Sequence, residues 1–406
     1  MAGRMIKPST LSKTIGACFA LMAVMPVTHA LSISYDQVNH AAMPQAVLYP
    51  FAYQGLVSIR ENHFADRLSR LPEEIPEYWD VVAVGRDILE QECRDKGRLA
   101  EFDYSYLPHK ELLTPSAVQK CGVGFSVQGM TLNYALIHKY GVPPTYWSDL
   151  FDFNRYPGKR ALPKQARYLF EIVLLADGVK PSYLYPLLAT KAGQDRALAK
   201  LDQIYDEVIW WNDVNRLKEW LDQGLVVMSV APDGAMLSND VDNIGVSRHQ
   251  VLYEMRYYAL LKSSKAPEVS YAFISYATQP DQQLKLAATQ YYGPTIQQAW
   301  RLLPSESVEY VTNHPHNLQG GILLNYEFYA EHGQALEDRF NAWLATKEAP
   351  VKRVSLASEM EKPVENAENL AQETEVDAIM LNAEMEFIGP EVIDFVGPNQ
   401  VLQQSL

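Results

Sequence analysis

Short apolar runs that alternate with amphipathic segments constrain the fold of this chain more than any other feature of its sequence. One apolar run, residues 79–84, ends at Gly85 and is followed by a predicted helix from Arg86. Another, residues 225–230, ends at the turn Pro232-Asp233-Gly234. Strands that alternate with helices predict layered α/β units with mostly parallel sheets. With 406 residues, the chain is long enough for two to three domains.

The same periodicities predict the other elements. Strands are expected at residues 31–35 and 160–162, and helices at 162–177, 191–207, 267–278, 281–289 and 325–346. Gly178 is expected to end the first of these helices. Trp210 and Trp211 close an apolar run, which is more typical of a buried core than of a stacking platform for a ligand, although both interpretations stay open.

The first thirty residues have the organisation of an export signal. Arg4, Lys7 and Lys13 precede an apolar run at residues 15–27, and small residues lead to Ala30. We therefore predict a signal peptide at residues 1–30, cleaved after Ala30. A membrane-spanning helix would need about 20 apolar residues, which this run does not provide. The mature protein is expected to be soluble and periplasmic.

The charge balance restricts the partners of the protein. Lys and Arg number 35 and Asp and Glu 49, for a net charge of −14, which argues against a nucleic-acid partner. Residues 347–406 hold 4 basic and 12 acidic residues, and this composition predicts a disordered acidic tail. Within that tail, residues 378–387 mix apolar and acidic side chains. They could dock on a partner as a short helix, and an inert tail is the alternative.

Export also determines how the cysteines are interpreted. Cys93 and Cys121 are the two cysteines that remain after signal cleavage, and they would lie in an oxidising compartment. We therefore predict a disulfide between them, with two buried free thiols as the alternative. Closing a loop of about 28 residues would stabilise the fold by about 3 kcal/mol.

Motifs of common enzymes are missing from the sequence. Gly122-Val123-Gly124 begins like a dinucleotide-binding loop, but Val127 takes the place of the third glycine. The nucleophile elbow Gly-x-Ser-x-Gly, the phosphate-binding loop and the His-Glu-x-x-His motif do not occur. His314-Pro315-His316 has no adjoining Cys, Asp or Glu at ligand spacing. The sequence thus predicts a protein that is not an enzyme and needs no cofactor or metal.

Eight sequence motifs in order resemble the periplasmic solute-binding proteins of ABC importers, in particular the polyamine-binding family. They are Cys121-Gly122-Val123-Gly124, residues 144–152, 156–162, 176–179, 195–202 and 208–211, Tyr292-Gly293-Pro294-Thr295, and residues 339–345. The resemblance implies a two-lobed α/β fold with hinge strands and a ligand cleft between the lobes. It also implies a monomer that closes on a small amine-bearing solute and delivers it to an ABC permease in the inner membrane.

The resemblance also assigns residues to the two lobes. Lobe 1 would comprise residues 31–124 plus 253–300, and lobe 2 residues 125–252 plus 301–346. The chain would cross between the lobes near residues 124–128 and 251–256 and return near Trp300.

Eight residues are expected at the ligand cleft by the same resemblance. They are Tyr35, Asp36, Arg86, Asp87, Asp233, Glu254, Arg256 and Tyr292. Polyamine binders have an aspartate at the position of Arg256, where it pairs with a ligand ammonium. An arginine pairs more naturally with a carboxylate or a phosphate. Lys164 and Gln165 likewise stand in a loop where polyamine receptors often have carboxylates, so the ligand is expected to be polyamine-like or zwitterionic.

These departures leave a second function open. A degenerate receptor would no longer transport a solute and would act as a binding or scaffold protein through its C-terminal tail. Retained binding of a small solute would distinguish the two functions.

Overall fold

The computed structural model describes residues 30–36, 47–55, 57–64, 71–237, 243–297, 299–308, 310–348 and 392–393. The predicted signal peptide, apart from Ala30, and the segment 378–387 lie outside these ranges. The strands are β1 (Leu31–Asp36), β2 (Ile59–Phe64), β3 (Val81–Val84), β4 (Val118–Gln119), β5 (Gly122–Ala135), β6 (Arg160–Pro163), β7 (Val208–Trp211), β8 (Met228–Pro232), β9 (Ile244–Leu260), β10 (Ile322–Leu323) and β11 (Val392–Ile393). The α-helices are α2 (Tyr49–Gly55), α3 (Arg86–Glu90), α4 (Leu169–Ala176), α5 (Leu184–Leu188), α6 (Lys191–Asp202), α7 (Val214–Asp222), α8 (Asp233–Leu237), α9 (Pro267–Ala277), α10 (Pro280–Gln290), α11 (Ser305–Val308) and α12 (Tyr326–Glu348).

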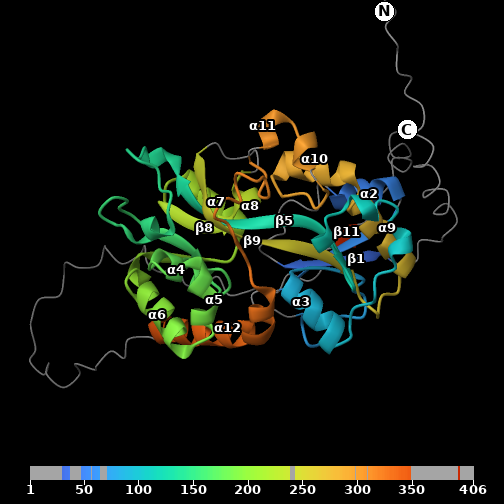
Figure 1. The fold of residues 1–406 in the computed structure, drawn as a ribbon, viewed down its shortest axis with the longest axis horizontal. Coiled ribbons are helices and arrows are strands. Elements are labelled where there is room, and N and C mark those ends of the chain that lie inside the picture. The colour runs from blue at the N-terminus through green and yellow to red at the C-terminus, as the bar shows by residue number, and fades with distance from the viewer. Residues whose placement is uncertain are drawn as a thin grey trace, which may run out of the picture.

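One mixed sheet runs through the described part of the protein, in the order β11-β2-β1-β3-β9-β5-β8-β6-β7. At one end β1 pairs in parallel with β2 and β3, and at the other end β6 pairs in parallel with β7 and β8. Between them, β5 and β9 form a long antiparallel pair that crosses the middle of the molecule (Figure 1). Two parallel sheets are thus joined by a central pair of shared strands.

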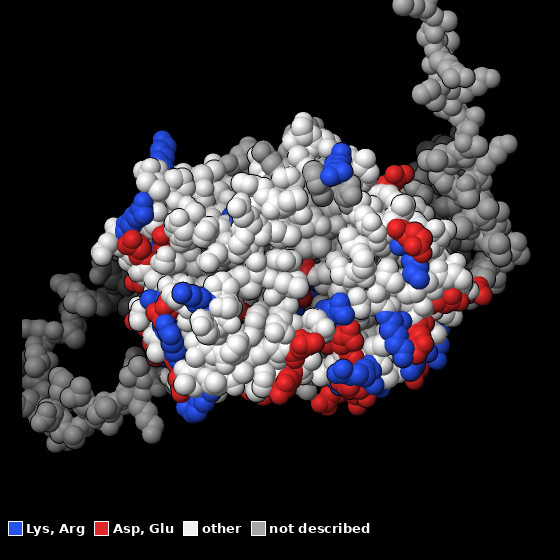
Figure 2. Space-filling model, in the orientation of Figure 1, with Lys and Arg blue, Asp and Glu red and all other residues white. Residues whose placement is uncertain are grey.

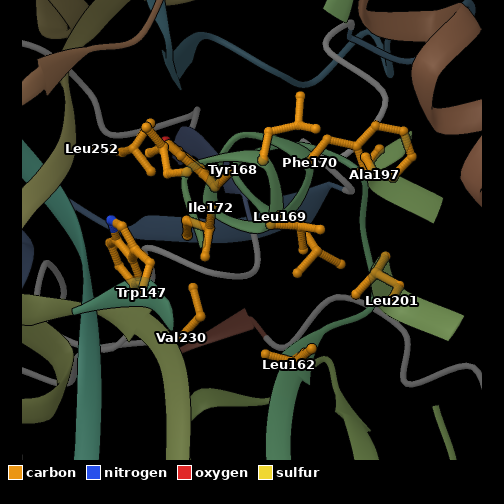
Figure 3. Close-up of a cluster of buried hydrophobic side chains, with 14 of the residues drawn as sticks. Trp147, Leu162, Tyr168, Leu169, Phe170, Ile172, Ala197, Leu201, Val230 and Leu252 are labelled. Atoms are coloured by element: carbon orange, nitrogen blue, oxygen red, sulfur yellow. The ribbon is translucent and has the colours of Figure 1, made fainter. Parts of the chain in front are cut away.

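Each parallel sheet has a hydrophobic core of its own. In the first lobe, β1 and β3 pack with α9 through residues such as Ile33, Ala83 and Phe273. In the second lobe, Trp147, Leu169 and other side chains of α4 and its neighbours form the largest cluster (Figure 3). This arrangement confirms the predicted two-lobed α/β fold.

Three segments cross between the lobes. In β5, Val123 pairs with Tyr258 of the first-lobe half of β9, whereas Leu132 pairs with Val230 of β8 in the second lobe. The return is expected near Trp300, whose neighbour Ala299 packs in the first-lobe core. Farther along the chain, β10 pairs in parallel with β9. The residue boundaries of the lobes stay a prediction.

The predicted helices are present, but two of them differ in their bounds. Helices α6, α9, α10 and α12 each begin within one residue of the predicted start, and α6 ends at Asp202, five residues before the predicted end. The helix predicted from residue 162 begins only at Leu169, because residue 163 still belongs to the parallel strand β6 and a loop follows. Gly178 ends α4 as predicted, with a φ of 81° that favours glycine.

The predicted disulfide is present, and the last long helix runs into the segment predicted to be a tail. Cys93 and Cys121 are bonded with their Cα atoms 5.9 Å apart, which ties the segment after α3 to the start of β5. Helix α12 continues to Glu348, two residues into the segment predicted to be disordered. Near the C-terminus, the short strand β11 pairs antiparallel with β2.

Two properties of the surface bear on possible partners. None of the described helices combines the length and the apolar composition that crossing a bilayer requires. On the face drawn in Figure 2, acidic and basic side chains are interspersed along the lower edge, and the upper half is mostly uncharged. This face therefore offers no extended basic surface.

Candidate ligand site between the lobes

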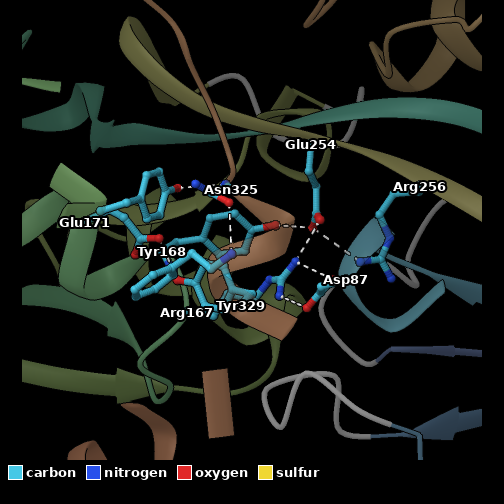
Figure 4. Close-up of polar contacts among 10 residues, drawn as sticks. Asp87, Arg167, Tyr168, Glu171, Glu254, Arg256, Asn325 and Tyr329 are labelled. Carbon is cyan, nitrogen blue, oxygen red and sulfur yellow. Dashed lines mark hydrogen bonds and ion pairs between the residues drawn. The ribbon is translucent and has the colours of Figure 1, made fainter. Parts of the chain in front are cut away.

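A buried guanidinium group lies where the two lobes meet. Arg167, in the second-lobe loop between β6 and α4, is only 3% exposed. Its Nη1 donates to Asp87 Oδ2 at 2.7 Å, and its Nη2 donates to Asp87 Oδ1 at 3.3 Å and to Glu254 Oε2 at 2.8 Å (Figure 4). Asp87 belongs to α3 of the first lobe and Glu254 to the crossing strand β9. One side chain thus links both lobes and the strand that joins them.

Glu254 accepts hydrogen bonds from three side chains. Its Oε2 receives the bond from Arg167, and its Oε1 receives one from the Tyr168 hydroxyl and one from Arg256 Nη1, the latter at 3.3 Å. Arg256 also donates to the carbonyl oxygen of Ala83 at 3.3 Å. Two arginines and two carboxylates therefore balance their formal charges in a site that is almost closed to solvent. Buried charges need such pairing, because water no longer stabilises them.

The backbone of Tyr168 is turned into an unusual conformation at this site. Its φ of 66° is rare for a bulky residue and costs about 1–3 kcal/mol. The turn brings the Tyr168 hydroxyl to Glu254 from the second lobe. Strained residues of this kind cluster at ligand sites, where the surrounding structure holds them in place.

Gly85 allows the charged groups to approach the end of β3. A Cβ atom at this position would lie 2.8 Å from both Asp87 Oδ1 and Glu254 Oε2, and 3.2 Å from Arg167 Nη2. A side chain here would therefore displace the ion pairs. The glycine that ends the predicted strand is required by this close contact.

Aromatic and acidic side chains of the second lobe support Arg167 from behind. The Tyr329 ring centre lies 4.6 Å from the Arg167 guanidinium carbon, a favourable cation–π distance. The Tyr329 hydroxyl donates to Glu171 Oε1 at 2.6 Å and accepts from the Tyr168 amide at 3.3 Å. Burial raises the pKa of the Glu171 carboxyl above its usual value, although the hydrogen bond from Tyr329 opposes this shift.

Three of the eight residues expected at the cleft come together in this cluster. They are Asp87, Glu254 and Arg256. Arg86 lies at its margin, where the guanidinium carbon is 4.6 Å from the Tyr326 ring centre and Nη2 lies 3.3 Å from Glu90 Oε1. Since Tyr326 begins α12 of the second lobe, this contact also joins the two lobes.

Three of the other four expected residues lie elsewhere: Tyr35, Tyr292 and Asp233. Tyr35 shares the inward face of β1 with Leu31 and Ile33, so alternation along the strand buries it in the first-lobe core. Tyr292 is buried in the same core. Asp36 is the last residue of β1, and its side chain lies outside the described part of the structure.

Asp233 is buried on the opposite face of the crossing strands. A Cβ atom at Gly129 would lie 3.4 Å from Asp233 Oδ2, so Asp233 lies on the face of β5 to which Gly129 points. Its neighbour Gln128 points to the other face, together with its paired residue Glu254. The Thr312 hydroxyl donates to Asp233, and Arg248 Nε lies 3.7 Å from its Oδ2. Burial raises the pKa of Asp233, an effect that Arg248 partly offsets.

Arg167 and Tyr168 were not predicted from the sequence. Lys164 and Gln165 were considered in the same loop, but Lys164 points to the surface and pairs with Glu348 at 3.1 Å. One feature of the sequence could have indicated Arg167: it stands directly before the apolar helix α4, where a buried charge needs a partner. The backbone turn at Tyr168 has no sequence signature, since residues other than glycine rarely adopt it.

Comparison with known proteins gives consistent matches. Residues 71–316 match a family described as bacterial extracellular solute-binding protein. A gamma-aminobutyric acid-binding protein of Pseudomonas aeruginosa is 32% identical over 335 residues, which cover 81% of this chain and 95% of that protein. The PBP AgtB from A. tumefaciens R10, solved in complex with agropinic acid, is 25% identical with a TM-score of 0.67, covering 79% of this chain and 99% of that one. An ABC transporter substrate-binding protein from Bradyrhizobium japonicum USDA 110 is 23% identical with a TM-score of 0.66, and the match covers 78% of this chain and 99% of that one.

Proposed function

Because this chain belongs to the bacterial extracellular solute-binding proteins, we propose that it is the periplasmic binding component of an ABC importer for a small zwitterionic amino acid. The favoured ligand is gamma-aminobutyric acid (GABA) or a close analogue. The similarity to the GABA-binding protein of P. aeruginosa supports this ligand class. In this role the protein binds its solute, closes and delivers it to a permease without chemical change.

The balanced charges between the lobes are the observation that carries the proposal. A diamine would bring two positive charges to a site that already contains Arg167 and Arg256 with Asp87 and Glu254 as counter-ions. A zwitterion brings one charge of each sign and leaves the site neutral. The ammonium would bind to the carboxylates, and the ligand carboxylate would bind to the arginines, which suit a bidentate contact.

Ligand binding would then be an exchange of ion pairs. Arg167 holds Asp87 and Glu254 in the described conformation, so the ligand ammonium would replace its guanidinium at these carboxylates. The ligand carboxylate would in turn engage the released guanidinium of Arg167 together with Arg256. The closed form would keep its ion pairs, and differential contacts would shift the population from open to closed.

The polyamine ligand expected from the family resemblance is the competing possibility, and calorimetry separates the two. Removing one partner of a buried ion pair costs about 2–5 kcal/mol, which corresponds to roughly thirty-fold to several thousand-fold in affinity. We expect micromolar or tighter GABA binding and putrescine binding at least about thirty-fold weaker. Arg256→Asp should reverse this preference. Micromolar putrescine binding by the unchanged protein would favour the polyamine class instead.

Asp233→Asn provides a matched control on the opposite face of the crossing strands. If the ligand binds at the Arg167 cluster, this variant should keep its GABA affinity within about threefold, less than 1 kcal/mol. A large loss of affinity would place the ligand near Asp233, as the sequence analysis expected. The alternative of a degenerate scaffold protein predicts that calorimetry detects binding of neither amino acids nor amines.

A further inference from the structure

A buried glutamine shares the face of the crossing strands that carries the charged cluster. In the antiparallel pairing of β5 and β9, Gln128 lies opposite Glu254, and Ser126 lies opposite Arg256. Residues directly opposite each other, and residues two apart along a strand, present their side chains to the same face. The four side chains therefore form one polar surface between the lobes.

The amide of Gln128 is only partly used within this surface. The residue is 6% exposed, and its Nε2 donates to Ser126 Oγ at 3.4 Å. Its Oε1 is buried and has no hydrogen-bond partner among the residues that the structure describes. A buried acceptor without a donor is unfavourable, and such groups are rare in folded proteins.

We propose that Gln128 is a specificity-determining residue whose carbonyl oxygen accepts a hydrogen bond from the ligand ammonium. This inference rests on the proposed function, because it assigns a third acceptor to the same bound zwitterion. Gln128 lies opposite Glu254, and Ser126 lies opposite Arg256. Gln128 is therefore next to the carboxylate to which the ligand ammonium is expected to bind. A neutral amide adds an acceptor without adding a charge, so the site remains balanced for a zwitterion.

The neutrality of Gln128 also gives it a part in selection. A third carboxylate at this position would favour ligands with an excess of positive charge, such as diamines. An apolar residue would leave one ammonium proton without an acceptor. The amide thus satisfies the ammonium without changing the charge that the ligand must carry.

Gln128→Met tests this role by removing the amide at nearly constant volume. We expect GABA affinity, measured by calorimetry, to fall about 10- to 150-fold, the usual effect of losing a hydrogen bond to a charged group. The melting temperature of the ligand-free protein should stay the same or rise, because an unsatisfied buried group is removed. Gln128→Asn keeps the amide but moves it away from the ligand, because the side chain is one methylene shorter. This variant should also weaken GABA binding, and it replaces Gln128→Met in the test if the methionine variant does not fold.

Gln283→Met is the matched control. This first-lobe glutamine is 1% exposed and fully bonded, since its Oε1 accepts from the Thr295 amide at 2.6 Å and its Nε2 donates to the Thr278 carbonyl at 3.1 Å. Its replacement should lower the melting temperature and leave GABA affinity unchanged. The two glutamines thus have opposite expected effects on stability and on binding.

Butyrate, which lacks the ammonium, identifies the end of the ligand that Gln128 contacts. In competition with GABA, butyrate should bind to the wild-type and Gln128→Met proteins equally well. Unchanged GABA affinity in Gln128→Met, or an equal loss for GABA and butyrate, would overturn the assignment while the proposed function stands. Failure of the wild-type protein to bind GABA would overturn the proposed function and, with it, this role of Gln128.

Discussion

Two buried arginines of the second lobe, seven positions apart, are held in opposite ways. Arg160 is fully buried and donates to backbone carbonyl oxygens of its own lobe, at 2.9 Å to Leu150, 2.6 Å to Gly158 and 2.7 Å to Tyr156. Arg167 is almost as buried, but it donates to carboxylates of the first lobe and of the crossing strand β9. The same side chain thus serves two different purposes.

The difference shows where stability and function reside in this fold. Burial lowers the pKa of Arg160 to about 10, which is still well above neutral pH. The guanidinium therefore remains charged, and the dipoles of the backbone carbonyl groups stabilise it. Its partners belong to the same lobe and stay in place however far the lobes separate. In the proposed mechanism, the partners of Arg167 would move away when the lobes open. We therefore expect bonds within a lobe to determine stability and bonds across the lobes to determine closure.

Arg160→Met should cause the largest loss of stability. The substitution leaves three buried carbonyl oxygens without a donor, each at a cost of about 1–3 kcal/mol, for a total of at least about 3 kcal/mol. Urea unfolding should show this loss, while calorimetry on the folded protein should give an unchanged GABA affinity. A parallel loss of affinity would mean that the loop held by Arg160 also shapes the ligand site.

The disulfide gives the corresponding test in the first lobe. The Cys93→Ser/Cys121→Ser double variant should lose about 3 kcal/mol of unfolding free energy, because the unfolded chain regains the entropy of an open loop. The Asp87 site does not depend on the bond directly, so GABA affinity should be retained. Alkylation of the exported protein without reductant should label neither cysteine, and two labelled thiols would contradict the bond.

Arg167→Met should have the opposite profile to Arg160→Met. It leaves Asp87 and Glu254 buried without their main counter-ion, and the lobes can relieve this by opening so that water reaches both carboxylates. We expect GABA affinity to fall by about 2 kcal/mol or more, roughly thirty-fold, with little change in urea unfolding. Small-angle X-ray scattering of the ligand-free variant should show a larger radius of gyration. Equal losses of stability in the two methionine variants would remove the distinction between them.

The contrast between these arginines also marks the limit of what the sequence could predict. The strand at residues 79–84, Gly85 and the helix from Arg86 were predicted from local pattern alone, and the structure confirms them as β3 and α3. Asp87 follows from that unit, because side chains after the carboxyl end of a strand face the cleft of an α/β fold. Local periodicity was therefore sufficient for the part of the site that a single strand and helix build.

The part of the site that depends on the meeting of two lobes was not predictable in this way. Arg167 is distant in sequence from both Asp87 and Glu254, and neither spacing nor composition indicates their contact. Asp233 was expected at the same cleft as Glu254, but it lies on the other face of the crossing strands, next to Gly129. Position along a strand was predictable from sequence, whereas the face to which a loop residue turns required the three-dimensional structure.

Glu171 supplies the smallest expected effect and tests whether the support behind Arg167 depends on charge. Burial raises the pKa of the Glu171 carboxyl in the folded protein above its unfolded value, so the folded state holds the proton more tightly. Between these two pKa values the folded state binds more protons than the unfolded state, and stability therefore falls as pH rises.

Glu171→Gln imitates the protonated form and can still accept the hydrogen bond from Tyr329. The variant should match the wild-type protein in melting temperature at low pH and exceed it increasingly as pH rises through the folded pKa. Glu207→Gln, which replaces an exposed acid paired with Lys159, is the control and should change the melting temperature little. If the melting temperature of Glu171→Gln instead falls below that of the wild-type protein at neutral pH, the carboxylate is ionised and acts as a counter-ion of Arg167 within the second lobe.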